Sequence, residues 1–169
     1  TWSKYSLMHH QFITKLPKKV DKYSCSILGC AGIAGYGTVY NTVKIKRSDS
    51  VAIFGSGGLG LLAVNAARNL GAKKIIVIDI KDKKLSFSKK FGATHLINSK
   101  RRNPVSEIKK ITNGRGVDYA FDMVGKTETQ NFSLLSTKEG IPGYEIGGST
   151  ILTGFPREKL ELNTRDVLM

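Results

Sequence analysis

Apolar and polar residues alternate along most of the chain in blocks that predict strands and helices in turn. Short apolar runs predict strands, and longer stretches with apolar residues at helical spacing predict helices. The strands are expected at 51–54, 75–78, 96–97, 117–124 and 150–153, and the helices between them at 59–70, 82–91, 104–112 and 128–135. This alternation is typical of an α/β protein whose parallel sheet is covered on both faces.

The handedness of the connections narrows this class further. Right-handed crossovers predict a Rossmann-type doubly wound parallel sheet with helices on both faces and the strand order 3-2-1-4-5. A sixth strand would complete the fold, but the sequence ends at Val167-Leu168-Met169. We therefore expect a sheet that is truncated before its sixth strand.

The first 43 residues follow a different pattern. Tyr5–Met8 and Phe12–Leu16 are predicted as short extended pieces, and residues 27–43 as a helix with a glycine-rich start. Two strands cannot bury a core alone, so these pieces are expected to be the edge of another structure. His9 and His10 would point to opposite faces of a strand and would not form a metal pair.

Composition and charge limit the classes of function. The 169 residues are 40% hydrophobic and 24% charged, with a net charge of +14. The basic clusters lack the interleaved aromatic residues of single-strand binders, so we predict solvated faces and neither a nucleic-acid nor a membrane partner. Cys25 and Cys30 do not make a disulfide framework, which favours a reduced, cytoplasmic setting. The first residue is not Met, which suggests a piece of a longer chain.

The most informative motif follows the first of the five strands. Residues 55–60, Gly-Ser-Gly-Gly-Leu-Gly, satisfy the pattern G-x-G-x-x-G between a strand and a helix. In that context Gly55 permits the tight turn, Gly57 lets the backbone approach a pyrophosphate, and Gly60 lets the helix pack closely on the sheet. The amides of Gly58 and Leu59 are expected to point at the phosphates, helped by the helix dipole.

Asp79 ends the next strand, 19 residues after Gly60. Its carboxylate can accept hydrogen bonds from the adenosine ribose and would repel a 2′-phosphate, so we predict NAD(H) rather than NADP(H) as the cofactor. Lys81 and Lys84 would soften that repulsion. A glycine-rich turn with an incidental acid, and a methyltransferase, which also places an acid after its second strand, are the alternatives.

Beyond this motif, the chain resembles the zinc-containing alcohol dehydrogenases of the medium-chain dehydrogenase/reductase family. The resemblance covers nearly the whole chain, and its segments are more specific together than any one alone. Besides the glycine motif they are Leu28-Gly29-Cys30, Gly35-Tyr36-Gly37, Val77-Ile78-Asp79-Ile80, Phe91-Gly92-Ala93-Thr94, Gly116-Val117-Asp118-Tyr119 and Phe121-Asp122-Met123-Val124-Gly125.

The resemblance assigns roles to four further residues. It implies that Cys30 is a ligand of a catalytic zinc, although a lone cysteine is more often a small buried hydrophobe. Cys25 matches no functional residue of the family, so it is expected in the core. It implies that Lys84 reaches the adenosine ribose, where the alternative is a solvated helix lysine, and that Val124 and Thr153 lie near the nicotinamide. The family's other zinc ligands come from an N-terminal domain and are absent from this chain, so the zinc site is incomplete.

The resemblance also implies a division into domains and an activity. Residues 1–20 would be remnant strands of the N-terminal catalytic, GroES-like domain, and 21–169 an NAD-binding Rossmann domain that is incomplete at its C-terminus. The intact protein is expected to be an NAD-dependent alcohol dehydrogenase, a homodimer or homotetramer that transfers a hydride between a small alcohol and NAD. The chain alone is expected to bind NADH with little or no turnover. A non-enzymatic NAD(H)-binding or regulatory module is the alternative, and residues 138–148 have no assigned role.

Overall fold

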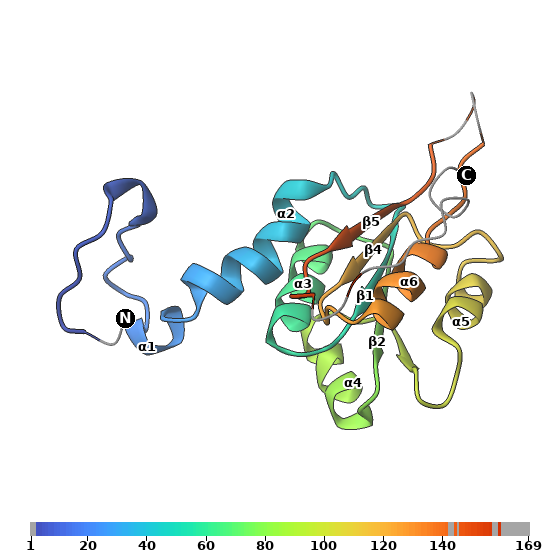
Figure 1. Ribbon diagram of the computed structural model, residues 1–169, viewed down its shortest axis with the longest axis horizontal. Coiled ribbons are helices and arrows are strands. Elements are labelled where there is room, and N and C mark those ends of the chain that lie inside the picture. The colour runs from blue at the N-terminus through green and yellow to red at the C-terminus, as the bar shows by residue number, and fades with distance from the viewer. Residues whose placement is uncertain (1–2, 142–143, 145, 157–158, 160–169) are drawn as a thin grey trace.

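Five parallel strands form one sheet, which lies among the helices that connect its strands (Figure 1). The computed structural model describes residues 3–141, 144, 146–156 and 159. The sheet has the order β3-β2-β1-β4-β5, which confirms the predicted doubly wound topology. Its strands are β1 (Ser50–Phe54), β2 (Lys74–Asp79), β3 (His95–Asn98), β4 (Tyr119–Asp122) and β5 (Ser149–Leu152). The expected truncation before a sixth strand falls on residues outside the described ones.

Helices connect the strands and cover both faces of the sheet (Figure 1). Capping explains where some of them begin: Asn103 accepts a hydrogen bond from the Ser106 amide, and Pro104 occupies the first turn, where its missing donor is harmless. The connecting helices are α3 (Gly58–Asn69), α4 (Asp82–Ser88) with a 3-10 turn η3 (Lys89–Phe91), α5 (Pro104–Ile111) and α6 (Thr127–Leu135). Each lies where the sequence predicts a helix, within one or two residues apart from the end of α4.

The strands alternate their side chains between two separate cores. Val51 and Ile53 of β1 face one core with residues of α3, whereas Ala52 and Phe54 face the other with Ile108 of α5. Because a strand has a period of two, a one-residue slip in register would exchange these sets. The paired register Val51↔Ile75 and Val51↔Tyr119 therefore determines which residues meet at each edge of the sheet.

The N-terminal arm, residues 3–27, extends away from the sheet (Figure 1). The two predicted strands are wrong: within residues 3–20 the chain has no strand, and its only helical element is the 3-10 turn η1 (His10–Phe12). The predicted extended pieces have no partner strand here, and strands need one for their backbone hydrogen bonds. Apolar side chains such as Tyr5 and Phe12 are 83% and 80% exposed.

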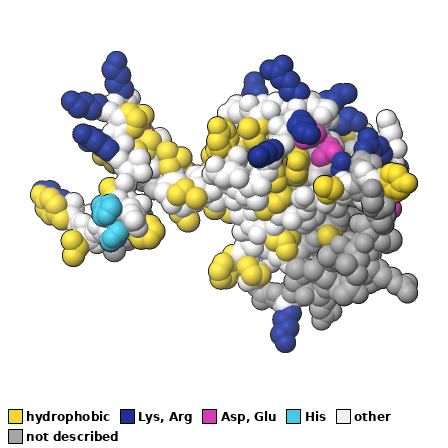
Figure 2. All heavy atoms as spheres, turned by 90° about the horizontal axis from the view of Figure 1, so that it is seen from above, with side chains coloured by type: hydrophobic (Ala, Val, Ile, Leu, Met, Phe, Trp, Pro, Cys, Tyr) yellow, Lys and Arg dark blue, Asp and Glu magenta, His cyan; other side chains and the backbone are white. Residues whose placement is uncertain are grey.

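Two other predictions for this region are also wrong. His9 and His10 do not point apart, because the turn η1 brings their ring centroids to 4.6 Å. The histidines of the arm lie together in Figure 2. Cys25 is not in the core: it ends the short helix α1 (Lys22–Cys25) in the arm and is only half-buried. The helix that carries it does not contact the sheet, so no core surrounds it.

A long helical segment joins the arm to the body, as predicted for residues 27–43. It consists of η2 (Leu28–Gly37), a π-helix, and α2 (Thr38–Thr42). The Thr38 amide donates to the Ile33 carbonyl five residues earlier, which is the wider hydrogen-bond spacing of a π-helix. Its C-terminal part packs on α3, where Gly35 and Val39 are buried.

Two features complete the description of the chain. The loop after α6 is closed by a hydrogen bond from the Gly148 amide to the Lys138 carbonyl (2.8 Å). No helix within the described ranges is long and apolar enough to cross a membrane.

Candidate functional site: the carboxyl edge of the sheet

The turn between β1 and α3 is as tight as its glycines predict. Gly55 has φ +96°, and its amide donates to the Ile78 carbonyl of β2 at 2.7 Å. A side chain at Gly55 would meet Val124 at 2.7 Å, and one at Gly60 would collide with the Gly55 carbonyl. These two glycines therefore serve the fold itself, because the turn and the start of α3 leave no room for a Cβ atom.

Gly57 differs from its neighbours in this turn. A Cβ atom at Gly57 or Gly58 would have no neighbour within 4 Å among the described residues, and Gly57 has an extended backbone, with φ −76° and ψ −168°. The first amides of a helix have no partner within it. No side chain of the described residues caps those of α3. The chain therefore presents open backbone and a helix N-terminus, the arrangement that binds phosphate groups.

Asp79 is tied to this turn by the residue between the first two glycines. The Ser56 amide and hydroxyl both donate to Asp79 Oδ2 at 2.8 Å, and the Lys81 amide donates to Oδ1 at 3.0 Å. Partial burial raises the pKa of Asp79, but these hydrogen bonds and the charge of Lys84 outweigh it and hold the pKa below the ordinary value of 3.8. The carboxylate is therefore ionised at neutral pH.

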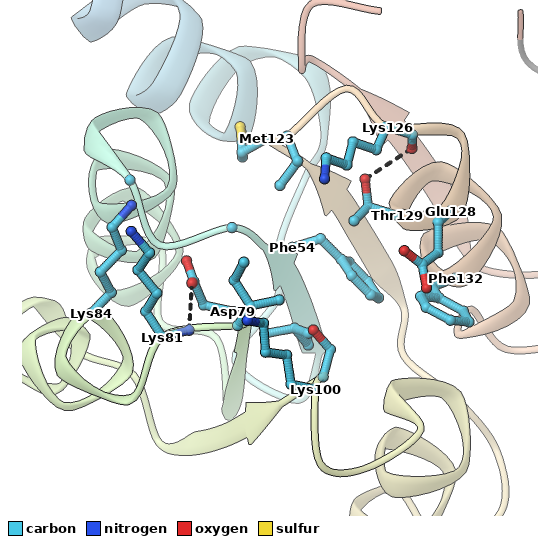
Figure 3. Close-up of a pocket in the computed structure, with 16 residues that line it drawn as sticks. Phe54, Asp79, Lys81, Lys84, Lys100, Met123, Lys126, Glu128, Thr129 and Phe132 are labelled. Atoms are coloured by element: carbon cyan, nitrogen blue, oxygen red, sulfur yellow. Dashed lines mark hydrogen bonds between the residues drawn. The ribbon is translucent and has the colours of Figure 1, made fainter. Parts of the chain in front are cut away.

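A cavity of about 610 Å³ opens where β1, β2 and β4 end (Figure 3). Lys81 and Lys84 stand beside Asp79, and residues of the start of α6 lie across the cavity. Four lysines and two carboxylates are among its lining residues, so the surplus charge is positive. The sixteen lining residues are Phe54, Gly55, Gly57, Ile78, Asp79, Ile80, Lys81, Lys84, Ser99, Lys100, Met123, Val124, Lys126, Glu128, Thr129 and Phe132.

The structure brings most of the predicted cofactor residues to this cavity. Its lining includes Gly55, Gly57, Asp79, Lys84 and Val124. The other three residues of the motif, Gly58, Leu59 and Gly60, form the first turn of α3 and are not among the lining residues.

Thr153 follows β5 and does not line the cavity. Its amide donates to the Asp122 carbonyl at 2.9 Å, which keeps it at the same edge of the sheet. Its hydroxyl oxygen is buried without a hydrogen-bond partner in the described part of the chain.

Cys30 lies elsewhere, on η2, with an exposed thiol. Within the described ranges no three His, Cys, Asp or Glu side chains come together as metal ligands. The described residues therefore do not fit a complete zinc site, and Cys30 can be one ligand of such a site but not the site itself.

Sequence reasoning missed several lining residues. Two of them are lysines: Lys100 follows β3, and Lys126 precedes α6. Two are apolar, Phe54 and Phe132, and form part of the wall of the cavity. The available signal was their place in the chain: in a parallel sheet, residues that follow each strand meet at the carboxyl edge. Ser56 stands at a variable position of the motif, and only the structure shows its contact with Asp79.

Known proteins are similar to this chain in sequence and in fold. Residues 58–169 match the family model described as zinc-binding dehydrogenase. The chain is 32% identical over 166 residues to an S-(hydroxymethyl)glutathione dehydrogenase of Synechocystis sp., covering 98% of this chain and 43% of that protein.

Solved structures agree with this match. The benzyl alcohol dehydrogenase from Acinetobacter calcoaceticus superposes with a TM-score of 0.81 at 33% identity, over 91% of this chain and 41% of that one. An alcohol dehydrogenase zinc-binding domain protein from Burkholderia ambifaria gives 0.80 at 34% identity, over 90% and 40%. The chain belongs to the zinc-binding dehydrogenase family, and it spans less than half the length of these relatives.

Proposed function

We propose that the chain is the NAD(H)-binding domain of a zinc-dependent alcohol dehydrogenase, which transfers a hydride between an alcohol and NAD. The observation that carries the proposal is the cavity at the carboxyl edge of β1, β2 and β4, with the Gly55–Gly60 turn on one side and Asp79 on another. Doubly wound sheets bind dinucleotides at this edge. The family and the named activities of the similar proteins support the alcohol as substrate.

Each part of the cofactor has a counterpart in the described residues. The open backbone at Gly57 and the first amides of α3 would receive the pyrophosphate, and the surrounding lysines add to its attraction. Asp79, with Lys84 beside it, would receive the adenosine ribose. Val124 and Thr153, at the ends of β4 and β5, would lie toward the nicotinamide, which supplies the hydride when bound.

The zinc belongs to the intact protein in this proposal. Cys30 would supply one thiolate ligand, and the remaining ligands lie outside the described residues. We therefore assign this chain the binding and positioning of the cofactor, with little or no turnover by itself. The non-enzymatic alternative would use the same cavity, but membership of a dehydrogenase family does not favour it.

Two broader predictions remain part of the proposal. Both cysteines are free thiols, which supports a reduced, cytoplasmic setting. We also propose a homodimer or homotetramer for the intact protein, with a small alcohol or aldehyde as its partner and no nucleic acid or membrane.

NADH binding by the purified chain tests the proposal. We expect saturable enhancement of NADH fluorescence, and competition by ADP-ribose, which lacks the nicotinamide. A chain that is folded by circular dichroism and shows no NADH binding would overturn the proposed function.

Gly57→Ala sharpens this test because it separates binding from folding. The new methyl group meets no described atom, so the variant should fold normally, but it would stand where the pyrophosphate approaches. We expect NADH affinity to fall about tenfold or more, since a displaced phosphate loses its backbone hydrogen bonds. The matched control is Gly29→Ala, where a Cβ is equally free of neighbours but lies on η2, outside the cavity.

A further inference from the structure

Ser56 is a buried polar residue whose side chain the proposed function leaves unused. It is 2% exposed, and it lies in the turn between β1 and α3. Its amide and hydroxyl both contact the same oxygen of Asp79, at 2.8 Å each. Because so little of Ser56 is exposed, its hydroxyl can influence a bound cofactor only through Asp79.

The two carboxylate oxygens of Asp79 accept different numbers of hydrogen bonds. A carboxylate offers about four acceptor positions. Ser56 uses two of them on Oδ2, and the Lys81 amide uses one on Oδ1. Counting the bonds made by the described residues, one position remains, and it is on Oδ1. The carboxylate is therefore held by two hydrogen bonds at Oδ2 and one at Oδ1, and Oδ1 has the acceptor position left for a ligand.

Lysines compete for the same carboxylate. Lys81 and Lys84 stand beside Asp79 in Figure 3, and Lys84 acts on it through its charge. Without the Ser56 hydroxyl, Oδ2 would keep only the Ser56 amide as a donor, and the carboxylate would turn more easily toward the Lys84 ammonium. Such an ion pair would neutralise the charge that repels a 2′-phosphate and would withdraw Oδ1 from the ribose hydroxyls.

We propose that Ser56 is a positioning residue that sets the preference for NADH over NADPH. Its hydroxyl adds a second hydrogen bond to that of its amide on Oδ2, and so keeps Oδ1 of Asp79 directed at the ribose and away from Lys84. The preference then depends on the Ser56–Asp79 pair and not on the acid alone. This inference rests on the proposed NAD(H) function, and its test distinguishes the two.

The test compares NADH and NADPH binding to the wild-type chain and to Ser56→Ala by fluorescence titration. We expect the Kd for NADH to rise about tenfold, which corresponds to ~1.4 kcal/mol, while the Kd for NADPH changes less than about twofold. Competition by 5′-AMP and by 2′,5′-ADP isolates the adenosine end and should show the same shift in preference.

Ser50→Ala is the matched control. Ser50 is also buried, and its amide and hydroxyl contact a single oxygen of Asp118 at the other edge of the sheet. This variant removes an equivalent hydrogen bond far from the cavity, so the ratio of the two Kd values should stay at the wild-type value.

The outcomes separate the inference from the function on which it rests. An unchanged ratio of the NADPH and NADH Kd values in Ser56→Ala, whether or not both affinities fall, would show a merely structural role and overturn the inference alone. No NADH binding by the folded wild-type chain would overturn both. If Ser56→Ala does not fold, Ser56→Thr should retain the preference and Ser56→Cys, a weaker donor, should reduce it; the opposite order would contradict the proposal.

A second readout follows the carboxyl group directly in the ligand-free chain. Carbon-detected NMR titration should show the pKa of Asp79 rising in Ser56→Ala, because the charged form loses a hydrogen bond. It should not move in Ser50→Ala. An unmoved pKa of Asp79 in Ser56→Ala would contradict the proposed contact.

Discussion

The two edges of the sheet hold the same pair of residue types in the same contact. At the carboxyl edge, the amide and hydroxyl of Ser56 donate to Oδ2 of Asp79, both at 2.8 Å. At the amino edge, the amide and hydroxyl of Ser50 donate to Oδ2 of Asp118, at 2.8 and 2.9 Å. Both carboxyl groups have a pKa below the ordinary value, since these bonds outweigh the effect of burial.

The second oxygen makes the difference between the two pairs. Oδ1 of Asp118 lies 3.3 Å from the ammonium of Lys138, so a cation of the same chain neutralises it. Oδ1 of Asp79 accepts a backbone amide, and its carboxylate lines the cavity. The Ser50–Asp118 pair, whose acid is paired with a lysine, joins β1 to the start of β4 and stabilises the fold. The Ser56–Asp79 pair, whose acid accepts a backbone amide in place of that lysine, can receive a ligand in the cavity at the carboxyl edge.

The largest expected difference between the two edges concerns their glycines. Gly116, beside the amino-edge pair, has φ +86°, and a Cβ atom there would lie 2.7 Å from the Thr137 backbone. Gly116→Ala should therefore lower the free energy of unfolding by about 3 kcal/mol or more. Gly57→Ala at the carboxyl edge should change it by less than about 0.5 kcal/mol. Urea denaturation of both variants checks this, and comparable losses would contradict the assignment of Gly57 to ligand binding.

Removing each acid separates stability from binding. Asp118→Ala and Asp79→Ala each leave the donors of a buried serine unpaired, so both should lose about 1–3 kcal/mol of stability. Only Asp79→Ala should alter cofactor preference, with the ratio of the NADPH and NADH Kd values falling about tenfold, or ~1.4 kcal/mol. Fluorescence titration beside urea denaturation makes the comparison. A changed ratio in Asp118→Ala would show that the edges are not independent.

The two lysines give a smaller contrast. Lys138→Met removes a half-buried ion pair and should lower stability by about 0.5–1 kcal/mol without affecting NADH binding. Lys84→Met should leave stability nearly unchanged but weaken NADH binding about threefold, because a cation beside the anionic cofactor is lost. Thermal unfolding and NADH titration distinguish the two results. A stability loss confined to Lys84→Met would reverse the roles given to these lysines.

Acid stability gives the smallest expected effect. The pKa of Asp79 and of Asp118 lies below 3.8 in the folded chain, so the folded state binds fewer protons than the unfolded state. Their contribution is fully present well above pH 3.8 and is lost as the pH falls below that value toward the folded pKa. Ser56→Ala and Ser50→Ala should each make the decline between about pH 5 and pH 3 shallower. Urea denaturation at several pH values measures it, and unchanged slopes would contradict the role of the hydroxyls.

The sequence by itself determined the sheet, its order and the position of the glycine turn. Short apolar runs, helical spacing between them and the glycine motif at residues 55–60 are local patterns, and together with the right-handed rule for crossovers they suffice to predict the sheet and its order. The same reasoning failed in the arm, where the extended pieces predicted at Tyr5–Met8 and Phe12–Leu16 had no partner strand, and at His9 and His10, whose predicted orientation assumed a strand.

Only the tertiary structure decided which polar residues meet. Ser56 and Asp79 are separated by 23 positions, and Ser50 and Asp118 by 68, so no local pattern connects them. The register of the parallel strands brings both pairs together, and the loops beyond them place Asp79 at the carboxyl-edge cavity and pair Asp118 with Lys138. The sequence gives the residue types. Whether an acid binds a ligand or stabilises the fold depends on its surroundings, which form only when the strands pair.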